Sequence, residues 1–329
     1  MSWPPMLAAA GVAFLLAGAL VPLLVRFAVG RNLLDVPNIR SSHEVPTPRL
    51  GGVAIAAGAW AGFLVSGSGE GMPLLAAATL VWAVGLADDF VNLHFRTKAA
   101  AQALVATALL ILFPPQLLAS APGILKAIVF VVGVFWIVAL CNAFNFMDGI
   151  DGITGGVAVI NALFLIAITG ATDSLLPALA GATLGFLIWN VSPASMFCGD
   201  SGSYFLGFGL AALALYTPVP GNGWSPVLFL AGVLVFTPYL FDTGYTLARR
   251  AWERKNVFSA HREHVYQRIT PATTMHRRTS NLYYGASVVT GLAALLVAGG
   301  GVEILAGLML VLVCCAGLAA LPLVVRTEN

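Results

Sequence analysis

The chain has 329 residues, of which 59% are hydrophobic and only 9% are charged, and its mean hydropathy is +0.91. A soluble globular protein carries about 25% charged residues, so this composition excludes a water-soluble globule. It predicts an all-α, polytopic integral membrane protein. The formal net charge is only +2, and we expect no nucleic-acid partner.

Apolar runs of roughly twenty residues, the length that crosses a bilayer, recur along the chain. We expect about 10–11 transmembrane helices in a single domain, residues 1–329, with no separate soluble domain and a long polar loop at 248–280. The candidate spans are 5–29, 51–66, 73–87, 99–118, 124–143, 155–170, 175–190, 204–217, 225–247, 281–299 and 303–325.

The positive charges predict an orientation, because Lys and Arg in short loops are retained on the cytoplasmic side. Nearly all of them flank odd-numbered connections, and only Lys126 lies near an even one. The flanking cations are Arg26, Arg31, Arg40, Arg49, Arg96, Lys98, Arg249, Arg250, Arg254, Lys255, Arg262, Arg268, Arg277, Arg278 and Arg326. We therefore expect the N-terminus on the outer side of the membrane and the C-terminus on the cytoplasmic side. The first span lacks the basic n-region of a signal peptide, so we expect it to be retained.

The stretch NAFNFMDGIDGITGG, residues 142–156, carries four polar side chains in three-residue steps directly after an apolar run. This spacing keeps Asn142, Asn145, Asp148 and Asp151 on one slowly drifting face of a helix end. The glycines between and after them allow a ligand or another helix to approach closely. Helix capping explains one aspartate but not four polar residues in register. The pattern therefore indicates a functional site.

Other acidic residues are predicted on the same face of the membrane. Asp88 and Asp89 end the third span in GLADDFVNLHFRTK, and Asp200 follows the seventh in MFCGDSGSYFLG. Carboxylates at a membrane boundary repel one another and lose hydration, so they need cations or a metal ion to remain charged. Three acidic clusters on one side indicate a shared site.

Carboxylates and amides together with cations favour magnesium-assisted phosphoryl transfer. Mg²⁺ prefers oxygen ligands and borrows oxygens from substrate phosphates, while Lys98, Arg49, Arg262 and the histidines could contact phosphate. An ion-coupled transporter remains the alternative of a different class, because such proteins also keep acids in membrane segments. Transporter sites, however, lie near the bilayer midplane, whereas these acids lie at helix ends.

The ordered motifs SSHEVPTPRLGG, ADDFVNLHFRTK, NAFNFMDGIDGITGG, FCGDSGSYFLG and HREHVYQRI resemble those of the polyprenyl-phosphate N-acetylhexosaminyl-1-phosphate transferase family. The resemblance covers nearly the whole chain, with the asparagine-aspartate series and GDSGS as its most specific parts. It implies transfer of a sugar 1-phosphate from a UDP-sugar to undecaprenyl phosphate, with release of UMP and with Mg²⁺ as cofactor and Mn²⁺ as a substitute.

The resemblance also implies roles for the metal and the phosphates. Asp200 and Asn145 would coordinate Mg²⁺ on the donor diphosphate. Asp88 and Asp89 would lie beside the acceptor phosphate, with Asp88 as the base, and with Asp200 they form the expected catalytic set. Asn92 and Lys98 would lie near the donor diphosphate.

The remaining expected roles concern donor binding. Phe197 matches the ring on which uracil stacks, Asp151 and the Ile150 backbone would meet the uracil edge, and Asp148 would order the loop. The motif of the last cytoplasmic loop would approach phosphate or sugar. With the residues near the diphosphate, the expected substrate-binding set is Arg49, Asn92, Lys98, Asn142, Asp148, Ile150, Asp151, Phe197, His261, Arg262 and His264.

Departures from the family pattern favour one branch. HREHVYQRI lacks the run of three histidines of the MraY branch, and PTPRLGG replaces its PTMGG. The sequence looks most like the WecA and WbpL branch, which starts O-antigen and other lipopolysaccharide or surface polysaccharides; an MraY-type muramoyl-pentapeptide transferase is the alternative. The expected partners are a UDP-linked N-acetylated sugar, undecaprenyl phosphate and bilayer lipid, with a homodimer left open.

One further acid interrupts an apolar segment. Asp242 lies in YLFDTGYTLARR, so we expect it to be buried and to pair with Arg249 or Arg250 along the same helix. Whether its role is structural or functional is open at this point.

Overall fold

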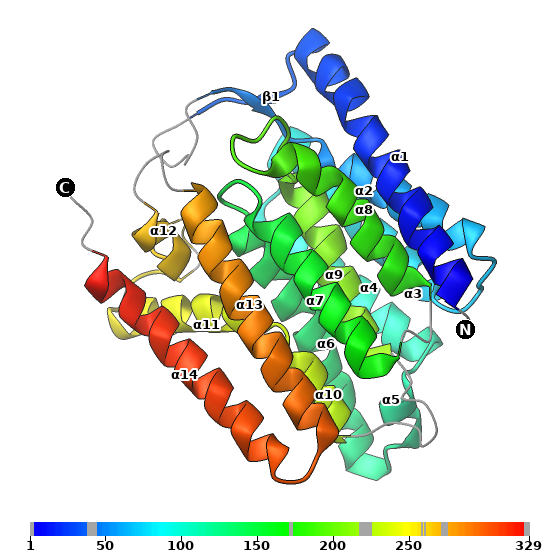
Figure 1. The fold of residues 1–329 in the computed structure, drawn as a ribbon, viewed down its shortest axis with the longest axis vertical. Coiled ribbons are helices and arrows are strands. Elements are labelled where there is room, and N and C mark those ends of the chain that lie inside the picture. Colours follow the sequence, from blue (N-terminus) through cyan, green and yellow to red (C-terminus); the bar gives the residue numbers. More distant parts are fainter. Residues whose placement is uncertain are drawn as a thin grey trace.

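The structure, a computed structural model, consists almost wholly of α-helices (Figure 1). It describes residues 3–37, 45–170, 174–216, 226–257, 259, 261–270 and 276–325. Arg40 and Arg326, which the predicted orientation used, lie outside these ranges. The all-α membrane fold predicted from the composition is confirmed.

The elements follow one another along the chain from Trp3 to Val324. The helices are α1 (Trp3–Gly30), α2 (Gly51–Val65), α3 (Met72–Val91), α4 (Phe95–Leu112), α5 (Gln116–Ser120), α6 (Gly123–Met147), α7 (Ile153–Thr169), α8 (Leu175–Asn190), α9 (Gly199–Tyr216), α10 (Pro226–Leu234), α11 (Thr237–Trp252), α12 (Val265–Ile269), α13 (His276–Gly299) and α14 (Glu303–Val324). Two short strands, β1 (Leu34–Asp35) and β2 (Thr47–Pro48), pair antiparallel.

Each predicted span falls on one helix or on two consecutive helices, and the span predicted over 99–118 is divided between α4, which ends at Leu112, and the start of α5. Six of the described helices are long and apolar enough to cross a membrane, namely α1, α3, α4, α6, α13 and α14. The pair α10 and α11 meets the same criterion together, and α2, α7 and α8 are shorter apolar helices. The remaining span corresponds to α9, which has 18 residues. The protein is therefore multi-pass.

The prediction of one continuous helix over 225–247 is wrong. α10 ends at Leu234 and α11 begins at Thr237, and the two helices are bent by 71°. Pro238 lies in the first turn of α11, where its missing N–H costs nothing because that donor has no partner inside the helix. The polar stretch 248–280 is also not all loop, since it includes the end of α11, all of α12 and the start of α13.

Two predicted helix ends were too early. α3 continues to Val91 and α6 to Met147, so the acids at 88 and 89 and the amides at 142 and 145 lie within helices. A helix end predicted from hydropathy falls at the first polar residue of the sequence. The helix itself continues past that residue, because neighbouring helices provide hydrogen-bond partners for the polar side chains. The helix ends therefore present these side chains in fixed directions.

Small residues bring α9 close to its neighbours. A Cβ added to Gly85 of α3 would lie 2.6 Å from the carbonyl oxygen of Asp200. A Cβ added to Gly52 of α2 would lie 2.3 Å from the nitrogen of Gly202. Small residues allow helix backbones to approach this closely in membrane proteins. The N-terminal end of α9 is thus enclosed by α2 and α3, and this fixes the position of Asp200.

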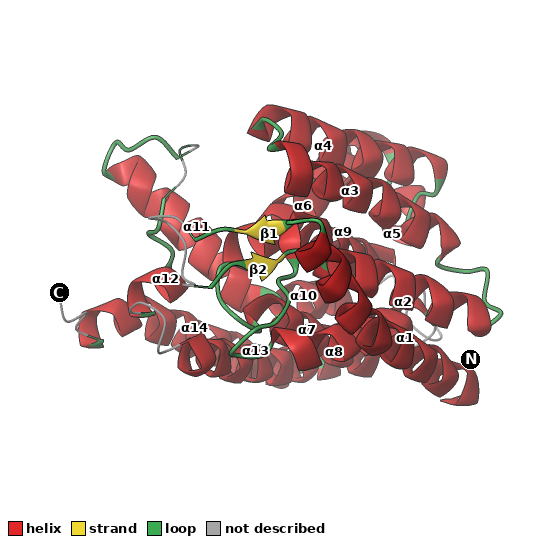
Figure 2. Cartoon of the chain, turned by 90° about the horizontal axis from the view of Figure 1, so that it is seen from above, coloured by secondary structure: helices red, strands yellow, loops and turns green. Residues whose placement is uncertain are grey.

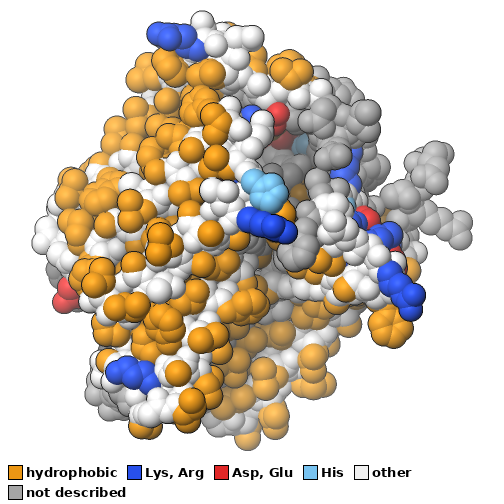
Figure 3. All heavy atoms as spheres, turned by 180° about the vertical axis from the view of Figure 1, so that it is seen from behind, with side chains coloured by type: hydrophobic (Ala, Val, Ile, Leu, Met, Phe, Trp, Pro, Cys, Tyr) orange, Lys and Arg blue, Asp and Glu red, His pale blue; other side chains and the backbone are white. Residues whose placement is uncertain are grey.

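The outer faces of the bundle suit a lipid environment. Hydrophobic side chains cover most of the face in Figure 3, and large ones such as Leu104, Phe135 and Leu323 are more than half exposed. Seen from above in Figure 2, β1 and β2 lie over the middle of the bundle, between α1 and α11. The strands therefore cover one end of the helix set, where the polar connections gather.

Candidate active site

Five connections that are distant in the sequence meet at one end of the bundle. They follow α1, α3, α6, α8 and α11, and Figure 1 shows β1 and α12 at this end, opposite α5. Residues in and beside these connections enclose a cleft with a volume of about 200 Å³. Its lining consists of Asp35, Arg49, Asp89, Asp148, Gly149, Ile150, Asp151, Asn190, Phe197, Cys198, Gly199, Asp200, Gln267 and His276.

Asp89 organises the start of α9. Its Oδ1 accepts a hydrogen bond from the backbone N–H of Asp200 at 2.8 Å, and its Oδ2 accepts one from Ser201 at 3.1 Å. These are donors that the first turn of a helix leaves without partners, and a carboxylate there also suits the helix dipole. Gly199 precedes them with φ +75°, and its added Cβ would lie 2.9 Å from Asp89 Oδ2. The geometry gives Asp89 a positioning role for Asp200.

Lys98 joins the other two acids of the expected catalytic set. Its Nζ lies 2.6 Å from Asp88 Oδ2 and 3.4 Å from Asp200 Oδ2. Asp88 is buried near the end of α3, and Lys98 comes from the first turns of α4. One ammonium group thus spans two carboxylates from helices that are far apart in the sequence. The cluster Asp88, Lys98 and Asp200 stands beside the cleft, which Asp200 itself lines.

The amides of the asparagine-aspartate series separate into two environments. Asn145 donates from Nδ2 to Ser203 Oγ at 3.1 Å, and Ser203 Oγ in turn donates to the backbone oxygen of Asp200. Asn145 therefore lies beside the first turn of α9, as expected for a partner of Asp200. Asn142 instead donates to Gln102 Oε1 at 2.6 Å. It is not in the lining of the cleft, so the structure does not bring it to the expected substrate-binding set.

The loop after α6 forms one wall of the cleft. Burial raises the pKa of Asp148 to about 7, with a further rise from the charge of Asp89. Gly149 is needed here, because an added Cβ would lie 2.1 Å from the hydroxyl of Tyr266 in α12. The close contact seats α12 against this loop and keeps Ile150 and Asp151 in the lining.

The connection between α8 and α9 forms the facing wall. The N–H of Phe197 donates to the oxygen of Pro48 at 2.8 Å, and the oxygen of Phe197 accepts from Gly51 at 3.0 Å. Asn190 ties this wall to the loop after α6, since it donates to Met196 O and accepts from the N–H of Gly152. Phe197 therefore lies on a rigid backbone, and its side chain helps to line the cleft as expected.

Asp151, in the loop after α6, lines the cleft and is held by two contacts. Its Oδ2 accepts a hydrogen bond from Ala194 N at 3.2 Å, and its Oδ1 lies 3.3 Å from His276 Nδ1. Burial opposes ionisation, but the hydrogen bond and charge of His276 hold the pKa of Asp151 below its ordinary value. An ionised, fixed carboxylate is thus available to accept a hydrogen bond from a ligand.

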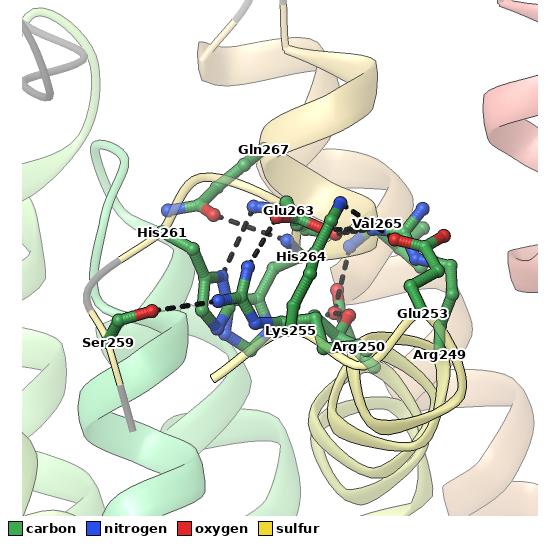
Figure 4. Close-up of polar contacts among 12 residues, drawn as sticks. Arg249, Arg250, Glu253, Lys255, Ser259, His261, Glu263, His264, Val265 and Gln267 are labelled. Atoms are coloured by element: carbon green, nitrogen blue, oxygen red, sulfur yellow. Dashed lines mark hydrogen bonds and ion pairs between the residues drawn. The ribbon is translucent and has the colours of Figure 1, made fainter. Parts of the chain in front are cut away.

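The segment with His261, Arg262 and His264 is tied to α11 by Glu263 (Figure 4). Glu263 forms ion pairs with Arg249 at 3.1 Å, with Lys255 at 3.3 Å and with Arg250. Partial burial, His264 and Arg250 lower the pKa of His261 to about 4, so this ring is neutral near pH 7. None of the three expected residues lines the cleft; Gln267, one turn further on in α12, does.

The expected pairing of Asp242 with Arg249 or Arg250 is wrong. Asp242 is fully buried and accepts hydrogen bonds from the N–H groups of Val265 and Tyr266 at 2.9 and 3.0 Å. Its Oδ1 also lies 3.1 Å from His264 Nδ1. The carboxylate thus satisfies the first turn of α12 from another helix, while the arginines pair with Glu263. Its role is to hold α12 against the bundle.

Sequence reasoning missed several residues of the lining. Asp35, Asn190 and His276 line the cleft but belong to none of the recognised motifs, and Gln267 lies within HREHVYQRI but was not singled out there. Asn190 had a local signal, since it is a lone amide at the end of an apolar run. Asn92 was expected in the site, but it lies exposed at the end of α3 with φ 51°.

The residues present are compatible with a magnesium ion that takes part of its coordination from substrate. Among the described residues, no three His, Cys, Asp or Glu side chains are grouped closely enough to form a protein cage for a metal. Mg²⁺ usually binds through one or two carboxylates together with substrate phosphates. Asp88 and Asp200 share the single ammonium group of Lys98, so one cation faces two carboxylates in this cluster. The donor set therefore fits a hard divalent cation.

Comparison with known proteins agrees with this arrangement. The model of glycosyl transferase family 4 matches residues 72–217. The decaprenyl-phosphate N-acetylglucosaminephosphotransferase of Mycobacterium leprae is 30% identical over 82% of this chain and 80% of its own length. The chain belongs to glycosyl transferase family 4. Within the family it is a polyprenyl-phosphate N-acetylhexosamine-1-phosphate transferase.

Two further relatives represent different branches of glycosyl transferase family 4. The undecaprenyl-phosphate alpha-N-acetylglucosaminyl 1-phosphate transferase of Thermotoga maritima is 31% identical over 76% of this chain and 78% of its own length. The phospho-N-acetylmuramoyl-pentapeptide-transferase of Desulforudis audaxviator is 34% identical over 65% of this chain and 76% of its own length. The family is thus clear, and these relatives are named for two different donor groups, N-acetylglucosamine and N-acetylmuramoyl-pentapeptide.

Proposed function

We propose that this enzyme transfers an N-acetylhexosamine 1-phosphate from a UDP-sugar to undecaprenyl phosphate, as the first membrane step of O-antigen or another surface polysaccharide. The observation that carries the proposal is the cluster of Asp88, Lys98 and Asp200 at the edge of a cleft that also contains Phe197 and Asp151. This arrangement supports a site in which Lys98 and other charged groups meet phosphates while Phe197 and Asp151 meet a nucleobase.

The base would occupy the part of the cleft with Phe197, Ile150 and Asp151. A phenyl ring offers a stacking surface, and an ionised carboxylate accepts a hydrogen bond from the N–H of uracil. The diphosphate would then extend toward Asp200 and Lys98. Arg49, which also lines the cleft, is placed to contact phosphate oxygens.

The acceptor phosphate needs little activation. A phosphate monoester has a second pKa near 6, so it is largely a dianion at neutral pH. One of its oxygens attacks the β-phosphorus of the donor directly; the bond from that phosphorus to the UMP oxygen breaks, and UMP leaves with the electron pair. Lys98 offsets negative charge on the phosphates, while Asp89 keeps the backbone of Asp200 in place. A labelled phospho-enzyme trapped without acceptor would contradict this direct transfer.

Magnesium would be held by Asp200 and Asn145, and it would supply neutralisation of the diphosphate charge. Mn²⁺ offers similar oxygen coordination and is the expected substitute. Asp200 and Asn145 meet at the first turn of α9 through Ser203, which supports a shared ligand. Calorimetric titration of Mg²⁺ in the presence of UMP should give weaker binding for Asn145→Ala than for the native chain.

The sequence of the last loop supports a donor without a muramoyl peptide. HREHVYQRI has two histidines separated by Arg262 and Glu263, and Glu263 is committed to three cations of α11 and its C-terminal turn. We infer that the donor is an N-acetylated hexosamine of the WecA and WbpL type. The chain would lie in the bacterial inner membrane with this site on the cytoplasmic side, where UDP-sugars are made.

The deciding experiment is transfer of radiolabel from a panel of UDP-sugars into butanol-extractable lipid, with UMP release measured in parallel. We expect label in lipid with an N-acetylhexosamine donor, and label that appears about 10²–10³-fold more slowly with Asp200→Asn. Label from UDP-muramoyl-pentapeptide alone would establish the muramoyl branch instead. Uptake of solute into vesicles without any lipid label would favour the transporter alternative.

A further inference from the structure

A second pocket adjoins the loop that follows α6. Its volume is about 330 Å³, which is within the range of small-ligand sites. It is lined by Asp151 and Gly152 of that loop, by Ser192 of the connection between α8 and α9, and by Arg277 and Asn281 of α13. Among the described residues, Asp151 is the only one that also lines the cleft. The pocket is thus a separate space that shares this loop with the candidate active site.

Arg277 gives the pocket a positive charge that the protein does not neutralise. Its side chain is exposed, and it forms no ion pair or hydrogen bond with any other residue that the structure describes. The carboxylate of Asp151 is already engaged, since Oδ2 accepts from the N–H of Ala194 at 3.2 Å and Oδ1 lies 3.3 Å from His276 Nδ1. The guanidinium group is therefore free to bind a phosphate through two parallel N–H groups.

The pocket lies at the end of a surface that suits hydrocarbon chains. α7 packs against both α8 and α13, and the three helices run side by side in Figure 1. α13 is long and apolar enough to cross a membrane, and Arg277 is its second residue. From the pocket, exposed apolar side chains continue along the outer faces of α8 and α13, namely Val191, Ile188, Leu282 and Val288. A cation thus stands where the polar end of this surface begins.

This order of groups matches a phospholipid, which carries a phosphate above its acyl chains. Basic pockets between transmembrane helices bind the headgroups of anionic lipids. We propose that this pocket binds the headgroup of an anionic phospholipid, with the phosphate on Arg277 and the acyl chains against α8 and α13. A headgroup with an amine fits less well, because both oxygens of Asp151 are engaged and the described lining holds no other acid. The hydroxyls of phosphatidylglycerol suit the side chains of Asn281 and Ser192.

A lipid in this pocket would also support the loop after α6. Ser280 Oγ donates to the backbone oxygen of Asp151 at 2.7 Å, and the hydroxyl of Tyr284 donates to the oxygen of Gly152 at 2.6 Å. Both side chains line the pocket. A headgroup held by Arg277 therefore packs against the residues that hold this loop, and its binding should make local opening of the loop rarer.

The test measures lipid binding to the delipidated full-length chain in detergent by native mass spectrometry. The native chain should bind dioleoylphosphatidylglycerol more tightly than dioleoylphosphatidylethanolamine. Arg277→Gln should weaken binding of the first phosphatidylglycerol about 5- to 30-fold, the range for one charge-assisted contact with a lipid phosphate. It should also remove most of the preference over phosphatidylethanolamine.

Arg278→Gln is the matched control, because it removes the same charge from the next residue of α13. Arg278 is exposed but does not line the pocket, so at physiological ionic strength its loss should change the affinity much less. Equal weakening by the two substitutions would show a general attraction to positive surface and would overturn the pocket. Displacement of the lipid by an equal concentration of glycerol 1-phosphate would overturn a lipid as the occupant.

Hydrogen–deuterium exchange tests the support of the loop. Phosphatidylglycerol should slow exchange of the backbone amides at 149–153 in the native chain and in Arg278→Gln, but not in Arg277→Gln. Unchanged exchange in the native chain with lipid bound would overturn the effect on the loop. Neither readout involves a nucleotide or a sugar, so the lipid site and the proposed transferase reaction can fail independently.

Discussion

Asp200 is the single residue on which the proposed chemistry depends most directly. Asp200→Asn should reduce kcat by about 10²–10³-fold, the usual cost of removing one group that stabilises transition-state charge. The fold should be retained, because Asp89 binds the backbone N–H of residue 200 and not its side chain. The measurement is UMP release at saturating substrates, together with a melting curve in detergent.

The matched control for Asp200→Asn is Glu70→Gln. Glu70 is exposed in the α2 to α3 connection, at the other end of the bundle, so it should retain native activity. Turnover of Asp200→Asn close to the native rate would remove Asp200 from the proposed role.

The raised pKa of Asp148 predicts how the affinity for the donor depends on pH. Its pKa is raised to about 7, so the carboxyl is protonated below that pH and becomes charged above it, inside a cleft that already contains Asp89 and Asp151. Asp148→Asn mimics the protonated form and should keep most of the native activity at pH 6. Above pH 7 the native enzyme should lose donor affinity relative to this variant.

The pH dependence of KM for the UDP-sugar, measured from pH 5.5 to 8.5 for both proteins, checks this expectation. The ratio of the two KM values should change near pH 7 and be flat below it. A ratio that is constant over the whole range would show that ionisation of Asp148 does not affect the site.

At the scale of helices, the close packing of α3 against α9 sets the relative positions of Asp88 and Asp200. A Cβ on Gly85 would lie within 2.7 Å of Asp200 O and of Ser201 Cα, and backbone atoms cannot move aside easily. Gly85→Ala should therefore separate the two helices, lower thermal stability and reduce kcat by about tenfold or more, as small displacements of catalytic groups do.

Gly209→Ala is the control for Gly85→Ala, because it adds the same methyl group to α9 where space exists. Its Cβ would meet Leu179 Cδ2 at 3.6 Å and Ala78 Cβ at 3.9 Å, which are ordinary contacts. It should preserve stability and activity. Equal effects of the two substitutions would show that the close approach at Gly85 is not what positions Asp200.

Glu263 connects the last loop to α11, and its removal should loosen that loop. Three cations converge on its carboxylate, and in Glu263→Gln they would repel one another without a counter-charge. Trypsin should then cleave after Lys255 or Arg262 several-fold faster in detergent-solubilised protein. Limited proteolysis followed by mass spectrometry provides the measurement.

Glu253→Gln serves as the comparison for the loop. Glu253 lies 2.7 Å from Lys255 but is on the exposed end of α11, so its loss should leave cleavage rates near native, as is usual for a surface ion pair. Similar acceleration in both variants would mean that Glu263 has no special part in holding the loop.

At the scale of the whole molecule, the orientation is directly testable. A cysteine at the exposed Ser195 position, in a background without native cysteines, should react with an impermeant reagent only from the cytoplasmic side. A cysteine at Glu70 should react only from the opposite side, because the two positions follow connections of odd and even number. Inverted-vesicle and whole-cell labelling give the two measurements; the reverse pattern would overturn the predicted topology.

The sequence predicted site residues correctly where neighbouring residues alone mark them. Asp88, Asp200 and the asparagine-aspartate series could be located because polar residues stand out at the ends of apolar runs. Gln267 and His276 could not be found in this way, because their place in the cleft depends on tertiary packing; Asp151 and His276 are 125 residues apart. Likewise, the bend at Pro238 and the hydrogen bonds that Asp242 accepts from α12 depend on neighbouring helices, which hydropathy does not register.

The cleft is lined by residues that are spread along the chain from Asp35 to His276. This has a consequence for biosynthesis. A ribosome that has completed α9 has already delivered Asp88, Lys98 and Asp200 to the membrane, but α12 and the start of α13 are still missing from the wall. Synthesis and folding proceed from the N-terminus onward, so α12 and α13 emerge after α9. A nascent chain would therefore hold the phosphate-binding groups before it could retain a nucleotide, and transferase activity would begin only when the penultimate helix enters the bilayer.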